Sequence, residues 1–331
     1  MRRDLGTGTG PRVVALGGGH GLAASLTALR RVTDRITAVV GVADDGGSSG
    51  RLRAQFGVLP PGDLRMALAA LCGDDTWGRT WQRVVQHRFG GEAELAGHSR
   101  GNLLITALWE ETGDAVAGLD WVAALLEAHG RVLPCSTMPL EIVAQVQGAD
   151  PEAPHDLETV RGQVAVATTR GEVRSIALDP RDPAACPEAI DAIHAADVIV
   201  LGPGSWFTSV LPHLLIPEQR RAIVESGARR VIVLNLDPRN DLEMSGAAIG
   251  AHLEVLARIA PELRVDAVIA DPSHAVDDAT LMRRCADLGG RLEIAAVAYP
   301  GGVRPGVHDP GRLAVAFGSL FASWQDDAPW R

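Results

Sequence analysis

Short apolar runs alternate along the chain with segments whose apolar residues recur every three or four positions. A run that is apolar throughout, such as Val-Ile-Val-Leu at 198–201, is typical of a parallel strand covered by helices on both faces. The sequence therefore predicts an α/β fold with a doubly wound, mostly parallel, Rossmann-like sheet. The strands are expected at 13–16, 36–42, 198–201, 231–236, 267–270 and 292–297.

The intervening helices are predicted from their periodicity. Leu64, Ala67, Leu68 and Leu71 have the i, i+3, i+4, i+7 spacing of one buried helix face, and Asp63 just before them is expected to be the N-cap. The other helices are expected from residue 22 onward and near 103–108, 119–126, 218–225, 247–259, 279–288 and 310–324.

The chain has no internal repeat and no low-complexity linker, which favours one domain over residues 1–331. We expect an ordered core over residues 12–325, with a helical segment inserted near 60–130. Residues 149–161 are polar and carry two prolines, which indicates a loop or a crossover. Two short strands are expected after it, at 163–167 and 173–178.

A glycine-rich loop follows the first strand. Residues 17–21 read Gly-Gly-Gly-His-Gly and precede a helix, and backbone amides at such a helix start bind phosphate well. The dinucleotide fingerprint fails, because its third glycine position falls on Leu22. A plain tight turn is the alternative to a phosphate loop. The expected phosphate contacts are Gly18, Gly19, His20 and Gly21.

The second strand ends in an acidic, glycine-rich run at residues 43–51. Ligands of open parallel sheets bind beyond the carboxyl ends of the strands, where this run is expected to lie. Carboxylates there can bind Mg²⁺ or accept hydrogen bonds from sugar hydroxyls. A solvated turn is the alternative. The expected ligand contacts are Asp44, Asp45, Gly46, Gly47, Ser48 and Ser49.

Two further helix starts carry candidate side chains. Arg65, two residues after Asp63, opposes the dipole of its helix, which favours anion binding. His98 and Asn102 stand at the start of the 103–108 helix, where a capping or structural role is the alternative. The candidate metal ligands are the aspartates at 44, 45 and 63, and we expect Asp45 and Asp63 to bind any Mg²⁺.

A second glycine loop follows the strand at 198–201. Two loops of the phosphate-binding type after two parallel strands indicate a ligand with a diphosphate. Asn235 ends the next strand, where its amide could read a nucleobase edge; capping of the strand is the alternative. The expected contacts in this loop are Gly202, Gly204, Ser205 and Thr208.

Composition narrows the partners. The net charge of −10 disfavours nucleic acid. No apolar stretch approaches the ~20 residues of a membrane span, and we expect no signal peptide. The four cysteines lack zinc-ligand or redox spacing, which suits buried thiols in the reducing cytoplasm.

Catalytic chemistry is sparse in this sequence. All 31 basic residues are arginine, which excludes a Schiff-base lysine, a pyridoxal-phosphate site and a Walker-A lysine. There is no Gly-x-Ser-x-Gly elbow, no His-Glu-x-x-His motif and no metal-spaced His/Cys cluster. We assign no catalytic residues and favour a binding protein over an enzyme.

The motifs GGGHG, ADDGGSSGRLR, PPGDLR, AGHSRGNLL and GPGSWFTS, in this order, resemble those of the YvcK family of gluconeogenesis factors, which is related to the CofD transferases. The resemblance runs from Val13 to Phe317 and implies a cytoplasmic, Rossmann-like protein. It also implies binding of a UDP-sugar such as UDP-N-acetylglucosamine and support of cell shape, peptidoglycan synthesis and growth on gluconeogenic carbon sources. The positions that match the family's motifs are Gly18, Gly19, Gly21, Asp44, Asp45, Asp63, Asn102, Gly204, Ser205 and Asn235.

The chain departs from the family pattern at two places. His20 replaces a common threonine, and residues 237–246 replace a stretch with a glutamine and a Gly-Glu-Thr sequence. Glu243 stands for that glutamate and Met244 for the threonine. Both departures are expected to change which nucleobase or sugar the site selects. The resemblance is compatible with a homo-oligomer and with regulatory protein partners.

The main alternative function is a metal-dependent CofD-type transferase. It would move a phospho-organic acid from a guanosine diphosphate donor to a deazaflavin, with the acidic residues holding the metal. A dehydrogenase is disfavoured because the dinucleotide register fails and no acid/base pair is evident. Opportunistic binding of NAD remains compatible with the loops.

Overall fold

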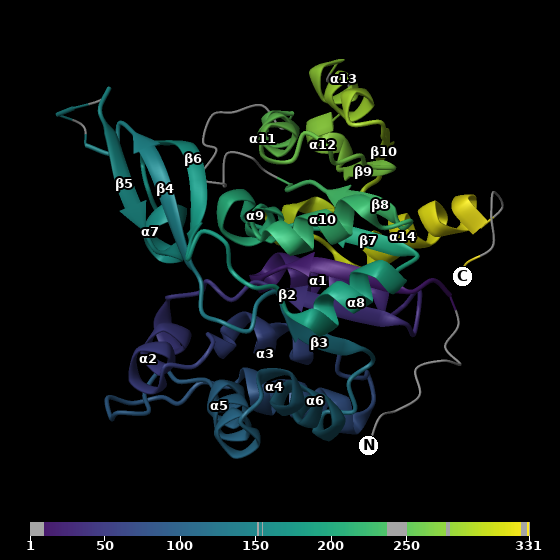
Figure 1. Cartoon of the computed structure of the whole chain (residues 1–331). Coiled ribbons are helices and arrows are strands. Elements are labelled where there is room, and N and C mark those ends of the chain that lie inside the picture. The colour runs from purple at the N-terminus through teal and green to yellow at the C-terminus, as the bar shows by residue number, and fades with distance from the viewer. Residues whose placement is uncertain are drawn as a thin grey trace.

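The computed structural model of this chain describes residues 10–150, 152–153, 155–236, 250–275, 279–325 and 330. Its centre is a seven-stranded sheet in which every pairing is parallel (Figure 1). The predicted α/β class with a mostly parallel sheet is therefore confirmed. In sheet order the strands are β10 (Arg291–Ile294), β9 (Ala267–Ala270), β8 (Arg229–Val233), β7 (Val198–Leu201), β1 (Val13–Gly17), β2 (Ile36–Val40) and β3 (Arg131–Pro134).

The strand order reverses once, next to β1. The chain passes from β1 to β2 and β3 on one side, and later returns to β7 on the other side of β1. At such a switch point the two connections leave in opposite directions, which opens space for a ligand beyond the carboxyl ends of the strands. The loops after β1 and β7, both rich in glycine, begin at this point.

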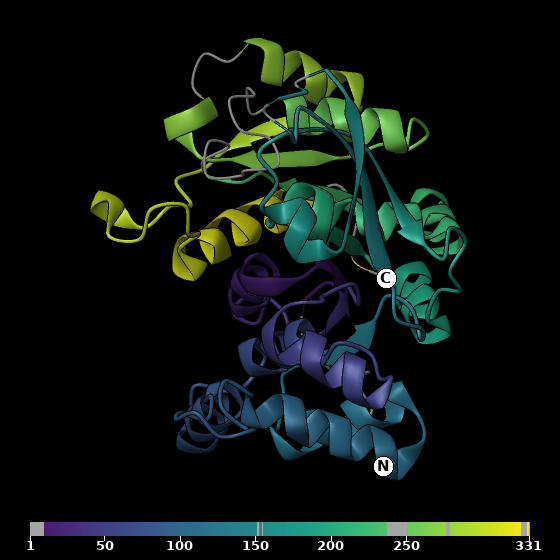
Figure 2. The same ribbon diagram turned by 90° about the vertical axis from the view of Figure 1, so that its left-hand side faces the viewer.

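Helices cover the sheet, and a further group of helices lies beyond β3 (Figure 1). Figure 1 and Figure 2 place α3 to α6 together at one end of the molecule, and α11 to α13 at the other. The first group falls within the stretch predicted as a helical insertion. The α-helices are α1 (Gly19–Leu29), α2 (Gly47–Phe56), α3 (Pro61–Ala70), α4 (Thr76–Gln86), α5 (Arg100–Thr112), α6 (Ala115–Leu125), α7 (Gln163–Ala167), α8 (Pro187–Ala195), α9 (Pro212–Leu215), α10 (Pro217–Glu225), α11 (Ala251–Ile259), α12 (Pro272–Ala275), α13 (Ala279–Asp287) and α14 (Pro310–Gln325). A π-helical turn, η2 (Trp206–Val210), precedes α9, and a 3₁₀ turn, η4 (Pro300–Gly302), precedes α14.

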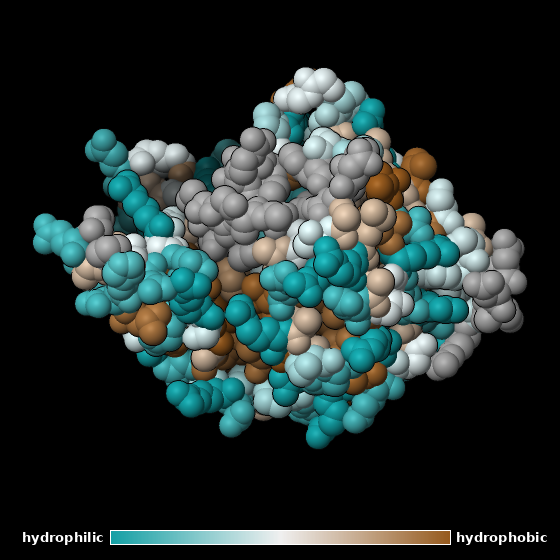
Figure 3. Space-filling view, turned by 90° about the horizontal axis from the view of Figure 1, so that it is seen from above, coloured by the Kyte–Doolittle hydropathy of each residue, from teal (hydrophilic) through white to brown (hydrophobic). Residues whose placement is uncertain are grey.

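A small antiparallel sheet projects from the domain on the left of Figure 1. Its strands are β5 (Leu157–Arg161), β4 (Glu141–Gln147) and β6 (Glu172–Asp179), in that order. Two predictions were wrong here, because β5 lies in the expected loop and 163–167 forms helix α7 instead of a strand. β5 is largely exposed, so its polar sequence concealed it, and Figure 3 shows mainly hydrophilic residues over this part of the molecule.

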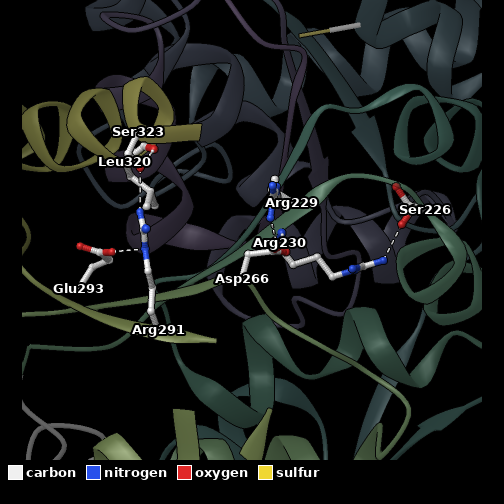
Figure 4. Close-up of polar contacts among 8 residues, drawn as sticks. All are labelled: Ser226, Arg229, Arg230, Asp266, Arg291, Glu293, Leu320 and Ser323. Atoms are coloured by element: carbon white, nitrogen blue, oxygen red, sulfur yellow. Dashed lines mark hydrogen bonds and ion pairs between the residues drawn. The ribbon is translucent and has the colours of Figure 1, made fainter. Parts of the chain in front are cut away.

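Charged residues of alternating sign line the amino ends of the strands from β10 to β1. In sheet order these residues are Arg291, Asp266, the Arg229–Arg230 pair, Asp197 and Arg12. Asp266 accepts bonds from the Arg229 guanidinium (2.9 Å) and the Arg230 amide (2.8 Å), as Figure 4 shows. Asp197 Oδ2 accepts the Arg12 amide at 2.8 Å. These contacts tie β8 to β9 and β7 to β1 at this end of the sheet.

The same end of the sheet holds the last helix. Arg291 donates to the Ser323 hydroxyl of α14 at 2.8 Å, and the Arg229 guanidinium lies over the ring of Trp324 in that helix, 5.7 Å from the ring centre. All four cysteines are buried and unpaired, as predicted. Across the described ranges, no helix is long and apolar enough to cross a membrane.

Candidate functional site

The first glycine loop joins β1 to α1 at the switch point. Gly19 has φ +56°, in the left-handed region that favours glycine. A Cβ on Gly18 would lie 2.5 Å from Asp63 Oδ2, and one on Gly21 would lie 2.1 Å from the carbonyl oxygen of Pro203. These positions exclude larger residues because a carboxylate and a second backbone segment approach the loop directly.

The second glycine loop joins β7 to η2 and packs on the first. The Ser25 hydroxyl of α1 donates to the Gly202 carbonyl at 2.9 Å, which adds to the contact of Gly21 with Pro203. Gly204 has φ +150° and remains partly exposed. Two such loops in contact can present backbone amides to the two phosphates of one diphosphate.

Asn235, at the end of β8, fixes the second loop. Its Oδ1 accepts the Gly204 amide at 3.0 Å, and its Nδ2 donates to the Gly204 carbonyl at 2.9 Å. Both polar atoms of the amide bond to Gly204, so Asn235 has a structural role here, closer to the capping alternative than to the reading of a base edge. Within the same loop, the Thr208 hydroxyl donates to Ser205 Oγ at 2.7 Å.

Asp44 and Asp63 bring two carboxylates to the first loop. Asp44 Oδ1 accepts the Gly46 amide at 2.9 Å, and its Oδ2 would lie 2.8 Å from a Cβ on Gly62, the residue before Asp63. We predicted Asp63 as the N-cap of α3, and this prediction was wrong, because the N-cap is Pro60. Asp63 lies in the first turn, and its carboxylate accepts a backbone hydrogen bond from Gly19.

The Asp63 carboxyl is held close to its protonation midpoint at neutral pH. Burial, and then the negative charge of Asp44, raise its pKa from 3.8 to about 7. The Gly19 amide and the Arg65 cation oppose this shift but do not cancel it. Asp63 as a whole residue is partly exposed.

Asp45 faces away from this pair and holds helix α7. Its Oδ1 accepts the Val164 amide at 3.0 Å. A Cβ on Gly162 would lie 2.1 Å from Asp45 Oδ2, so the start of α7 presses closely on the carboxylate. Asp45 therefore docks the small antiparallel sheet onto the loop after β2.

Four of the predicted side chains form one buried chain of hydrogen bonds behind the loops. Arg65 Nε donates to Asn102 Oδ1 (3.0 Å), Asn102 Nδ2 donates to Ser48 Oγ (3.0 Å), and Ser48 Oγ lies 3.0 Å from His98 Nδ1. Since Ser48 accepts from Asn102, its hydroxyl proton is free to donate to His98. Burial lowers the pKa of His98, and two nearby guanidinium groups lower it further, which keeps the ring neutral as an acceptor.

Arg65 anchors this chain from α3. It is 4% exposed, and its other end donates to Gln86 of α4. Burial lowers its pKa to about 10, so it remains a cation at neutral pH. The Ser49 hydroxyl also ties α2 to α3, because it accepts the Gly62 amide at 2.9 Å.

The acidic pair suits a divalent cation shared with phosphate. Mg²⁺ in proteins commonly takes one or two carboxylates and completes its shell with water and substrate phosphates. A dication between Asp44 and Asp63 would relieve the repulsion that raises the pKa of Asp63. No group of three or more His, Cys, Asp or Glu residues is arranged to hold a metal in the part of the chain that the structure describes.

The sequence profile of the family described as 2-phospho-L-lactate transferase CofD matches residues 13–291. The chain belongs to the CofD family. This span contains both glycine loops, the acidic run and the small antiparallel sheet, so the CofD match covers every segment of the site described above.

CofD-family relatives resemble the chain over most of its length. A Mycobacterium leprae protein described as "Putative gluconeogenesis factor" is 47% identical over 98% of this chain and 90% of its own. A "Gluconeogenesis factor" of Halalkalibacterium halodurans is 38% identical over 74% of this chain and 72% of its own. A crystal structure from Bacillus halodurans, titled as a member of the UPF0052 family, has a TM-score of 0.79 at 29% identity and covers 93% of this chain and 98% of its own.

In this CofD fold the predicted residues differ in their exposure. Those partly exposed at the loops are Gly19, Gly21, Asp44, Asp63, Gly204 and Ser205. The buried predicted residues, behind or beside them, are Gly18, Ser48, Ser49, Arg65, His98, Asn102, Gly202 and Thr208. His20 and Gly47 are exposed at the starts of α1 and α2. The predicted departures at Glu243 and Met244 lie outside the described residues.

Sequence reasoning missed three side chains that support the CofD loops. Gln86 ends a helix without any motif, and Gln219 stands beside Glu218 and Arg220 in a polar segment. His213 lies in the apolar run at 211–216, and this was a signal that could have been followed, because a buried polar group needs a partner.

Proposed function

We propose that this CofD-family protein binds a nucleoside diphosphate sugar of the UDP-N-acetylglucosamine type at the switch point between β1 and β7. The contact between the two glycine loops carries this proposal. A Cβ on Gly21 would lie 2.1 Å from the Pro203 carbonyl oxygen, so the two loops share one surface on which a diphosphate can lie.

The binding would serve regulation in the cytoplasm. Relatives that match most of the chain are named gluconeogenesis factors, which supports a role in growth on gluconeogenic carbon sources. We extend this role to the supply of peptidoglycan precursors and to cell shape, since a UDP-amino sugar is a precursor of that kind. Asp44 and Asp63 would hold a Mg²⁺ ion, which would supply positive charge to the diphosphate.

A second candidate is a transferase of the CofD type, which the family's description and the acidic pair support. A Mg²⁺ held there would supply positive charge to a phosphoryl group in transfer. The chain's own residues would orient the donor through the two glycine loops. A guanosine diphosphate donor and a deazaflavin acceptor would distinguish this activity.

Thermal unfolding with a ligand panel tests both candidates. The panel is UDP-N-acetylglucosamine, UDP-glucose, GTP and NAD, each with and without Mg²⁺. Ligand at about a hundred times its Kd stabilises the fold by roughly 2.7 kcal/mol, which is readily seen. A shift confined to the UDP-sugars supports the regulatory proposal, whereas no shift with any UDP-sugar refutes it.

Variants then locate the site. Asp63→Asn should remove the part of the shift that depends on Mg²⁺, while Asp182→Asn, on an exposed loop, should leave it intact. Turnover of a UDP-sugar by the wild type, lost in Asp63→Asn, would replace the regulatory proposal by an enzymatic one. Transfer to deazaflavin with a guanosine diphosphate donor would establish the second candidate.

A further inference from the structure

One carbonyl oxygen at the end of β1 accepts two hydrogen bonds. Gly17 O accepts the amide of Gly41, which follows β2, at 3.0 Å. It also faces Nε2 of His213, in α9, at 3.1 Å. A carbonyl has two lone pairs, so both contacts can be complete hydrogen bonds.

The contact with Gly17 fixes the state of the His213 ring. Nε2 must carry a proton to donate to the carbonyl, so Nδ1 is the acceptor, and Gln219 Nε2 lies 2.9 Å from it. The same Gln219 nitrogen lies 3.1 Å from the His213 carbonyl oxygen. Both side chains are 0% exposed. The imidazole is therefore neutral and held in one orientation from both sides.

Three ligand loops meet at this carbonyl. Gly17 begins the first glycine loop, and Gly41 precedes the acidic run that contains Asp44. His213 follows the second glycine loop through η2 and α9, which join without a break. A shift of any one loop would lengthen a hydrogen bond to Gly17 O.

We propose that His213 is a positioning residue that sets the mutual register of the three loops, and that Gln219 orients it. This inference rests on the proposed binding of a nucleoside diphosphate sugar to those loops. His213 itself makes no contact with the ligand in this scheme. Its effect on affinity comes from pre-organising the backbone amides and the acidic pair.

The test compares His213→Leu, His213→Gln and Gln219→Leu with wild type. We measure the Kd of UDP-N-acetylglucosamine with Mg²⁺ by calorimetry and the thermal midpoint of the ligand-free protein. His213→Leu should weaken binding about tenfold or more, since each lost constraint is felt at several ligand contacts. His213→Gln keeps an N–H donor on a chain of suitable length and should restore most of the affinity.

The control is Val122→Ala, at a buried position of α6 far along the chain from the loops. It should lower the midpoint as a core substitution does, yet leave the Kd unchanged. A merely structural role for His213 would give the same pattern as this control. A wild-type Kd in His213→Leu or, should that variant not fold, in Gln219→Leu would overturn the inference.

Amide hydrogen exchange separates this inference from the proposed function. If wild type binds no UDP-sugar, the proposed function fails, but the register of the loops can still be measured without ligand. His213→Leu and Gln219→Leu should then speed exchange at the amides of Gly41 and Gly204, whereas Val122→Ala should not. Unchanged exchange at both amides would refute the positioning role.

Discussion

Asp44 and Asp45 are neighbours in the chain, yet they serve different parts of the molecule. Asp44 turns toward Asp63 and the first glycine loop, where its charge helps raise the pKa of Asp63 to about 7. Asp45 turns toward α7 and accepts the Val164 amide at 3.0 Å. Adjacent carboxylates therefore need not act as a pair, and the ligand-facing one here is Asp44.

Asp45→Ala should loosen the small antiparallel sheet. The loss of one charged acceptor for a helix-start amide costs about 1 kcal/mol of unfolding free energy. Chemical denaturation measures this loss, and amide exchange at Val164 should become faster. Asp45→Asn keeps the accepting oxygen and should behave nearly as wild type. Equal stability of the alanine variant and wild type would show that this contact does not hold α7.

At the scale of elements, the site depends on how closely α1 approaches the loop after β7. No atom of a larger side chain fits at Gly21, because the Pro203 carbonyl carbon and oxygen would lie 2.6 and 2.1 Å from its Cβ. The approach is between backbones, so neither side can yield by changing a rotamer.

Gly21→Ala should therefore separate the two glycine loops. We expect at least about a tenfold loss of affinity for UDP-N-acetylglucosamine and a loss of stability of about 1–3 kcal/mol from overpacking. Calorimetric titration and thermal unfolding measure the two effects. The control is Gly90→Ala, where a Cβ meets no atom within 4 Å. An unaltered Kd in Gly21→Ala would mean that the loops bind independently.

The amino ends of β8 and β9 offer a second test of element packing. Asp266→Ala leaves the Arg230 amide and the Arg229 guanidinium without their shared acceptor, so unfolding free energy should fall by about 1–3 kcal/mol. Urea denaturation measures the change, and Asp266→Asn should recover part of it through its remaining oxygen. The amino ends of these strands lie opposite the glycine loops, so the Kd for UDP-N-acetylglucosamine should not change.

The sequence predicted the elements whose residues are buried on both sides, and missed those that depend on distant contacts. β7 and β9 have their predicted bounds, because four consecutive apolar residues predict a strand that is buried on both faces. Helix α7 was missed, since an alternating Gln-Val-Ala-Val-Ala reads as a strand until Asp45, 119 residues away, accepts the Val164 amide. The motif residues of the site were found, but their division into loop surface and buried support came only from the fold.

At the scale of the whole molecule, three buried groups give stability opposite dependences on pH. Burial lowers the pKa values of His213 and His308 from 6.5 to about 4. Between these values the unfolded chain binds a proton at each histidine that the folded chain does not, so stability falls as pH falls. Asp63 acts in the opposite sense between pH 3.8 and about 7, because the folded state holds the proton.

On unfolding at these pH values, the two histidines each take up a proton and Asp63 releases one, so the net uptake is one proton. Their combined effect should lower the unfolding free energy by about 1.4 kcal/mol per unit as pH falls from 6.5 toward 4. Denaturation in the presence of a chelator measures the slope. Asp63→Asn removes the opposing group, so its slope should be steeper by about the same 1.4 kcal/mol per unit. Parallel slopes would contradict the raised pKa of Asp63.

The alternating charges at the amino ends of the strands also bear on how the chain finds its topology. In the native order, arginine and aspartate follow one another from Arg291 through Asp266, Arg229 and Asp197 to Arg12. Exchanging β8 with β9, or omitting β9, would set arginine beside arginine, and like charges on adjacent strands repel. This row of charges therefore disfavours wrong strand orders during folding. Without it, apolar strands of such similar sequence could exchange places.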